Sequence, residues 1–139
     1  GMHAFPIRVF YEDTDLGGIV YHANYLKYVE RGRSAWIRDL GIDQNALRDV
    51  HGLVFAVHRI EADFRAPARL DDALTVHTCL AEARSGVRFV LAQEVTNAAG
   101  DTIFAATVTL VTMQVAGPGA GRPVRLPAEL RRLLPDPGA

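Results

Sequence analysis

The chain has 139 residues, of which 49% are hydrophobic and 22% are charged, as is usual for a soluble globular protein. Its net charge of −1 gives no general reason to expect a nucleic-acid partner. The single Cys79 excludes an intrachain disulfide and favours a reducing compartment. Because the chain shows neither a signal peptide nor an apolar run of about 18 residues, we expect a cytoplasmic protein without a transmembrane segment.

The first half of the chain predicts a strand followed by a long helix. Residues 5–12 alternate well enough for a strand, whereas residues 13–22 are too rich in aspartate and glycine to continue it. From 24 to 40, apolar residues recur every three or four positions, and Gly41 then supplies a helix stop. Residues 43–51 predict either a short second helix or an irregular connection.

The second half predicts strands joined mostly by tight turns. Residues 117–123 form a flexible Gly/Pro segment, and 127–134 predict a short terminal helix. The expected strands cover residues 53–64, 74–83, 87–96 and 102–115.

This order of elements favours an α+β fold in which a mostly antiparallel sheet wraps around one helix. Gly32, Ser34 and Ala35 thin one side of that helix, so it can approach a neighbour closely. One face or edge of such a sheet stays uncovered in a monomer. Because apolar residues are frequent in the last three strands, we expect a second subunit to close that surface.

Asp15 is the first candidate for chemistry. It lies just before the predicted helix, whose first N–H groups have no partner within the helix. A carboxylate beside such amides suits acyl chemistry, because the amides can hold an oxyanion while the carboxylate attacks or activates water. The competing interpretation is a turn or capping aspartate, which is the usual role of aspartate before glycine. Asp13 is expected to hold the turn.

His22 lies at the entry to the predicted helix, seven residues after Asp15. Its imidazole could relay a proton to a leaving thiolate or to water, and its backbone N–H could donate to an oxyanion at the positive end of the helix. A lone histidine is more often a hydrogen-bonded structural group, and that alternative stays open. Asn24 is expected to cap the helix.

Other patterns of reactive residues are missing. The remaining histidines have no metal-ligand spacing with each other or with Cys79, so no metal site is expected. The two serines lack the Gly-x-Ser-x-Gly turn of α/β-hydrolases, and residues 117–121 lack the context of a phosphate loop. Four arginines near strand ends could together grip the phosphates of a nucleotide-bearing ligand: Arg65, Arg69, Arg84 and Arg88.

Three segments resemble the hotdog-fold acyl-CoA thioesterases. Residues 13–25 read DTDLGGIVYHANY, and residues 28–33 follow as YVERGR. Residues 64–72 (FRAPARLDD) and 122–127 (RPVRLP) resemble later parts of the same proteins. The likeness covers roughly residues 5 to 130. It is strongest to the branch that contains the Tol-Pal-associated thioesterase and 4-hydroxybenzoyl-CoA thioesterase.

The resemblance implies a single hotdog domain over residues 2–139, with a five-stranded antiparallel sheet around one long central helix. It implies homodimers or homotetramers with active sites at the dimer interface. The family's catalytic carboxylate corresponds to Asp15, and the amide that polarises the thioester carbonyl corresponds to His22. Basic residues near the phosphates of coenzyme A (CoA) correspond to Arg84 and Arg88. A histidine at position 22 follows the Tol-Pal-type pattern and argues against 4-hydroxybenzoyl-CoA as substrate.

The sequence therefore predicts an acyl-CoA thioesterase that releases a carboxylic acid and CoA without a cofactor. Asp15 would act as nucleophile or general base, N–H groups near Tyr21 and His22 would hold the oxyanion, and the His22 ring would assist proton transfer. The alternative is a non-catalytic acyl-CoA or acyl-carrier binding module, for which a carboxylate beside the thioester brings only a desolvation cost. A hotdog dehydratase is a weaker choice, because its His-Phe-Pro-Gly-type motif is absent.

Overall fold

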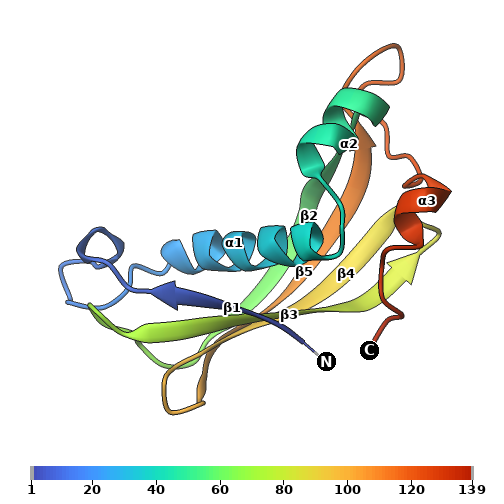
Figure 1. The fold of residues 1–139 in the computed structure, drawn as a ribbon. Coiled ribbons are helices and arrows are strands. Elements are labelled where there is room, and N and C mark those ends of the chain that lie inside the picture. Colours follow the sequence, from blue (N-terminus) through green and yellow to red (C-terminus); the bar gives the residue numbers. More distant parts are fainter. Residues whose placement is uncertain (1, 139) are drawn as a thin grey trace.

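A computed structural model describes residues 2–138, so the last residue of the predicted domain, at position 139, lies outside the described part. A five-stranded antiparallel sheet carries the long helix α1 (Asn24–Asp39) on one face (Figure 1). This arrangement confirms the predicted α+β fold. Across the sheet the strands follow the order β1-β3-β4-β5-β2, and their bounds are His3–Arg8 (β1), Leu53–Phe64 (β2), Ala73–Arg84 (β3), Arg88–Thr96 (β4) and Thr102–Gln114 (β5).

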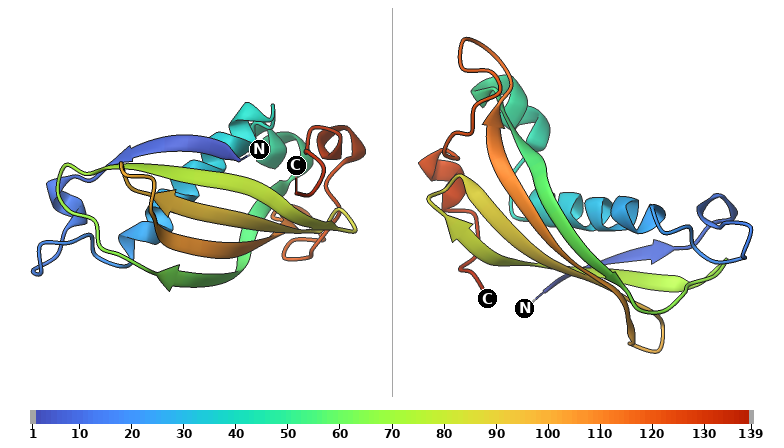
Figure 2. Two further views of the ribbon diagram at one scale, coloured as in Figure 1. Left: turned by 90° about the horizontal axis from the view of Figure 1, so that it is seen from below. Right: turned by 180° about the vertical axis from the view of Figure 1, so that it is seen from behind.

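The sheet curves around α1 instead of lying flat beneath it (Figure 2). The pairing of β2 with β5 shifts register between Val57 and Arg59, and that of β3 with β4 shifts between Leu80 and Glu82. Each shift places an extra residue on one of the two paired strands, and such a β-bulge bends the strand and increases its twist. Within residues 2–138, β1 and β2 are the edge strands, each paired with one neighbour.

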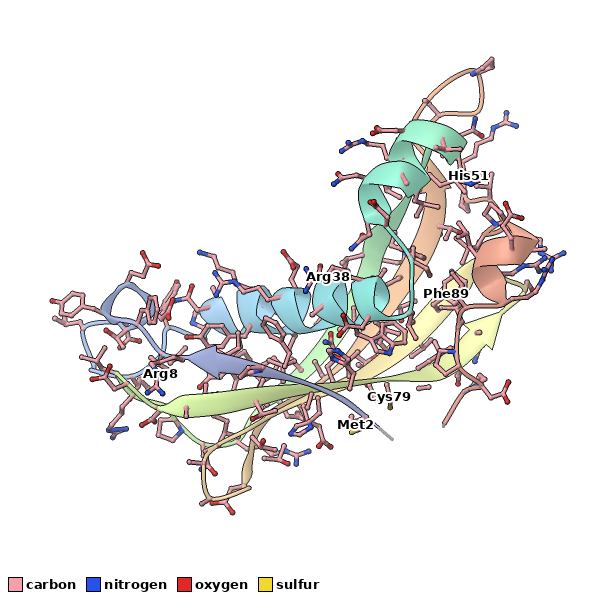
Figure 3. The ribbon with its side chains drawn as sticks, viewed as in Figure 1. Met2, Arg8, Arg38, His51, Cys79 and Phe89 are labelled. Carbon is pink, nitrogen blue, oxygen red and sulfur yellow. The ribbon has the colours of Figure 1, made fainter. Side chains whose placement is uncertain are left out.

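The buried side of α1 lies close to the sheet. Tyr28 and Val29 are fully buried and belong to the same apolar core as Phe89 of β4, which is labelled in Figure 3. At Gly32 an added β-carbon would overlap the side chain of Val76 on β3. The close approach expected from the small residues of this helix is therefore confirmed at Gly32.

A buried polar side chain also joins α1 to the sheet. Nε2 of Gln93 on β4 donates to the carbonyl oxygen of Val29 at 2.9 Å and to the hydroxyl oxygen of Thr78 at 2.8 Å. Removing either partner of such a buried hydrogen bond leaves an unsatisfied polar group, which is costly. These bonds therefore favour one position of α1 along β3 and β4.

The first strand is shorter than predicted. It ends at Arg8 instead of continuing to residue 12, and a 3-10 turn, η1 (Tyr11–Asp13), takes its place. The turn forms because Oδ2 of Asp13 accepts a hydrogen bond from the N–H of Phe10 at 2.8 Å. Side chains of aspartate commonly stabilise turns in this way, in competition with a strand.

The two shorter helices also refine the prediction. The segment 43–51, for which two alternatives stood open, is the helix α2 (Gln44–His51), and Asp43 caps it by accepting from the N–H groups of Asn45 and Ala46. The terminal helix α3 (Ala128–Arg131) is shorter than expected.

Candidate active site

A tight loop between β1 and α1 presents the candidate carboxylate. The N–H of Asp15 donates to the carbonyl of Ile19 at 2.9 Å, and the N–H of Gly18 donates to the carbonyl of Asp15 at 3.0 Å. Gly18 has a φ of +77°, which glycine adopts without strain. Thr14 and Val20 form an isolated antiparallel bridge across the loop. The loop is therefore closed by its own backbone, which fixes the position of Asp15.

The carboxylate of Asp15 has one oxygen engaged and one free. Oδ1 accepts from the N–H of Gly17 at 2.8 Å, so the turn role considered from the sequence is present. Oδ2 has no hydrogen-bond partner among residues 2–138, and the residue is exposed in the single chain. A carboxylate held through one oxygen can still use the other as nucleophile or base. The turn role and the chemical role are compatible.

Asp13 has the structural role expected of it. Besides its carboxylate bond to Phe10, its carbonyl accepts from the N–H of Tyr21 at 2.9 Å and from Nδ2 of Asn24 at 2.9 Å. The expectation that Asn24 caps the helix is wrong. Its side-chain amide donates back to the loop, and Ala23 occupies the N-cap position without a side-chain cap.

The amides at the start of α1 differ in their availability. The N–H of Tyr21 is engaged with Asp13, which speaks against its predicted part in an oxyanion site. The N–H groups of His22 and Ala23, by contrast, donate to no acceptor within residues 2–138. Unpaired amides at a helix N-terminus carry partial positive charge and attract anions. The backbone N–H groups that are free to bind an oxyanion are therefore those of His22 and Ala23.

An apolar hollow of about 350 Å³ adjoins these amides. The rings of His22, Tyr25 and Phe64 line it, with the centroids of His22 and Phe64 6.1 Å apart. Ile19, whose carbonyl accepts from the N–H of Asp15, lines it too, so the carboxylate-bearing loop forms part of the wall. The remaining lining residues are Val20, Arg65, Ala66 and Pro67.

Two buried tyrosines lie behind the loop and the hollow. Burial raises the pKa of the Tyr25 phenol, and burial together with the carboxylate of Asp13 raises the pKa of the Tyr28 phenol further. Both phenols therefore stay protonated at neutral pH. This excludes them as general bases.

Comparison with known proteins identifies the family to which this geometry belongs. The model of the thioesterase-like superfamily matches residues 9–134, nearly the whole chain. The chain belongs to this superfamily.

Two kinds of relatives support the assignment. The acyl-CoA thioesterase YbgC of Haemophilus influenzae is 36% identical over 128 residues, which cover 92% of this chain and 90% of the relative. The crystal structure of a probable thioesterase from Bartonella henselae is also 36% identical, with a TM-score of 0.82, covering 91% of this chain and 100% of that one. A 4-hydroxybenzoyl CoA thioesterase complex, 24% identical with a TM-score of 0.87 over 96% and 99% of the two chains, shares the fold. The hotdog resemblance predicted from the sequence is confirmed.

In this thioesterase-like chain, the predicted CoA-binding arginines lie far from Asp15. Arg84 ends β3, whereas the other end of β3 lies beside the Asp15 loop, where the N–H of Val9 donates to the carbonyl of Asp72 at 3.0 Å (Figure 1). Twelve residues of strand span roughly 36 Å at about 3.3 Å each. One chain therefore does not bring Arg84 and Arg88 together with Asp15.

Two further arginines gather at that distant end. A β-carbon added to Gly86, in the turn between β3 and β4, would lie 2.8 Å from Cδ of Arg131 and 3.4 Å from Nε of Arg125. Together with Arg84 and Arg88 they form what we call the arginine cluster. Sequence reasoning missed Arg125 and Arg131, because only the long-range return of the C-terminal segment brings them to the turn. The segment 122–127, which resembles the thioesterases, contains Arg125 but not Arg131.

The arginine cluster carries more positive charge than its own acidic neighbours balance. Arg84 pairs with Glu82 at 2.8 Å, but within residues 2–138 the other three arginines form no salt bridge. Arg84 and Arg88 face each other across neighbouring strands, where like charges are destabilising. An anionic ligand would relieve that repulsion.

Residues 2–138 show neither a metal-binding cluster nor a membrane-spanning helix. No group of three or more histidine, cysteine, aspartate or glutamate side chains in residues 2–138 could hold a metal ion. No helix in the same part is both long and apolar enough to cross a membrane.

Proposed function

We propose that this chain hydrolyses acyl-CoA thioesters to a free carboxylic acid and CoA. The observation that carries the proposal is an apolar hollow lined by His22, whose N–H has no acceptor within residues 2–138, and by Ile19 of the loop that carries Asp15. Oδ2 of Asp15 accepts no hydrogen bond in the same part of the chain. The acyl-CoA thioesterase YbgC of Haemophilus influenzae, aligned over most of both chains, supports the same reaction.

The reaction needs a nucleophile and an oxyanion site. In one route, Oδ2 of Asp15 attacks the carbonyl carbon, the C–S bond breaks, and water then cleaves the mixed anhydride to regenerate Asp15. In the other, Asp15 takes a proton from water, and the resulting hydroxide adds to the carbonyl before the C–S bond breaks. In both routes the N–H of His22 holds the oxyanion, and losing such a donor typically costs ~2.7–4 kcal/mol of transition-state stabilisation.

The leaving thiolate needs a proton. The ring of His22 is exposed and lines the hollow, with its centroid 4.6 Å from that of Tyr21. Histidine is the side chain most often used for proton transfer in enzymes. We propose that this ring delivers the proton to the CoA thiolate and regains one from the water that is consumed, directly or through Asp15.

We further propose that two copies of the chain share each active site, in a homodimer or in a tetramer of such dimers. The arginine cluster and Asp15 lie at opposite ends of β3, so the cluster of a second copy would hold the CoA phosphates. The long edge strand β2 leaves one side unpaired and exposes Val57, which favours pairing with another chain. CoA thioesters are intracellular metabolites, and Cys79 is a free thiol, which together support a cytoplasmic location.

The proposal is tested by measuring free thiol and free carboxylic acid released from butyryl-CoA and benzoyl-CoA by the purified protein. We expect the two products in a one-to-one ratio, at a rate proportional to protein concentration. A binding module would retain acyl-CoA without releasing thiol, and a dehydratase would act on an enoyl thioester without releasing thiol. Either result would replace the thioesterase assignment.

A further inference from the structure

The apolar hollow has a closed floor of aromatic rings. Tyr25 and Phe104 stack with centroids 5.0 Å apart and planes inclined by 11°, and they are only 4% and 0% exposed. Phe64 packs on both, at 5.9 Å from Tyr25 and 5.0 Å from Phe104. Tyr28 lies edge-on behind Tyr25 at 5.8 Å. A group entering beside His22 therefore meets packed rings instead of a passage.

The core beyond this floor offers no room for an extended chain. Between α1 and the sheet, the apolar void lined by Trp36, Phe55 and Phe89 measures about 10 Å³. That is about the space of one water molecule, and well-packed interiors do not open further without displacing side chains. A long acyl chain cannot lie along α1 in this structure.

The position of the free amide decides which part of the substrate enters the hollow. With the thioester carbonyl at the N–H of His22, one side of the thioester faces the rings of Tyr25 and Phe64. The acyl group is the apolar side, whereas the pantetheine arm of CoA carries amides that need hydrogen bonds. The acyl group is therefore the part that fits the hollow.

We propose that the enzyme selects compact acyl groups, of a few carbons or a single ring, with Phe64 as the specificity-determining contact and the Tyr25–Phe104 stack as the size limit. This inference rests on the proposed thioesterase function. A hollow of about 350 Å³ is at the small end of ligand sites, which span roughly 300–1,000 Å³. Edge and face contacts with Phe64 would add to the binding of a flat or branched acyl group.

The test is kcat/KM for butyryl-, benzoyl-, octanoyl- and palmitoyl-CoA, measured below the concentration at which the long-chain substrate forms micelles. We expect kcat/KM for butyryl-CoA and benzoyl-CoA to exceed that for palmitoyl-CoA by more than about a hundred-fold. Each methylene group that does not fit an apolar pocket lowers kcat/KM roughly ten-fold or more. Equal or higher values for palmitoyl-CoA would overturn the size limit while leaving the thioesterase function intact. Thiol release from none of the four would overturn the function itself.

A matched pair of variants tests the contact. Phe64 and Phe10 are 55% and 58% exposed, but only Phe64 lines the hollow, and neither substitution should unfold the protein. Phe64→Ala should lower kcat/KM for benzoyl-CoA by about ten-fold and that for acetyl-CoA far less, because one aromatic contact is lost. Phe10→Ala should leave both within about two-fold. Equal effects of the two variants on benzoyl-CoA would remove Phe64 from substrate selection.

Discussion

Asp15→Asn should lower kcat for thioester hydrolysis by about a thousand-fold, within the range that general-base and nucleophilic carboxylates supply. The variant should fold normally, because the asparagine carbonyl can still accept the hydrogen bond that Oδ1 of Asp15 receives from Gly17. What the variant loses is the free carboxylate oxygen, which can no longer attack the carbonyl or accept a proton from water. Initial rates of thiol release and a thermal melt of the same preparation measure both effects.

Asp13→Asn is the matched control for this prediction. Its side-chain oxygen can likewise keep the hydrogen bond from Phe10, and the carbonyl that binds Tyr21 and Asn24 is unchanged. We expect kcat within a few-fold of the original, because Asp13 supports the loop without touching substrate. A thousand-fold loss in Asp13→Asn beside full activity in Asp15→Asn would exchange the roles of the two carboxylates.

Replacing Arg125 and Arg131 together with glutamine should raise KM for acyl-CoA by about a hundred-fold and leave kcat nearly unchanged. Each hydrogen bond to a charged group contributes about 1.5–3 kcal/mol, and the two guanidinium groups pack beside the turn at Gly86 with no salt bridge within residues 2–138. They act on the phosphates, remote from the bond that breaks, so the effect falls on binding alone.

Acyl-pantetheine, which lacks the nucleotide phosphates, is the internal control for the arginine pair. Its KM should not change in the double variant. The exposed Arg38 on α1, which is labelled in Figure 3 and is not part of the arginine cluster, supplies a control substitution, Arg38→Gln. An unchanged KM for acyl-CoA would remove Arg125 and Arg131 from the binding site. A parallel rise for both thioesters would assign the effect to the acyl site instead.

The elements that local sequence determines were predictable. The three- and four-residue spacing over 24–40 identified α1, and the glycines after Asp15 identified a turn that the structure closes with backbone hydrogen bonds. The segment 13–25 alone indicates a hotdog thioesterase. In each case the signal lies within about fifteen consecutive residues.

What sequence reasoning missed depends on contacts between distant residues. The N–H of Tyr21 donates to the carbonyl of Asp13 because the loop folds back onto that residue, and no local sequence pattern reveals this contact. Asparagine is common at helix N-caps, but the side-chain amide of Asn24 donates to the carbonyl of Asp13 instead. Arg125 and Arg131 reach the turn at Gly86 only because the C-terminal segment returns across the sheet, where the N–H of Leu126 donates to the carbonyl of Gly86 at 2.8 Å.

A structure of the Asp15→Asn variant with unhydrolysed benzoyl-CoA bound would test the proposed active site most directly. We expect the thioester carbonyl oxygen within about 2.7–3.1 Å of the His22 backbone nitrogen, with the phenyl ring against Phe64 and the side chain at position 15 facing the carbonyl carbon. A carbonyl bound away from the start of α1, or an acyl group outside the hollow, would contradict it.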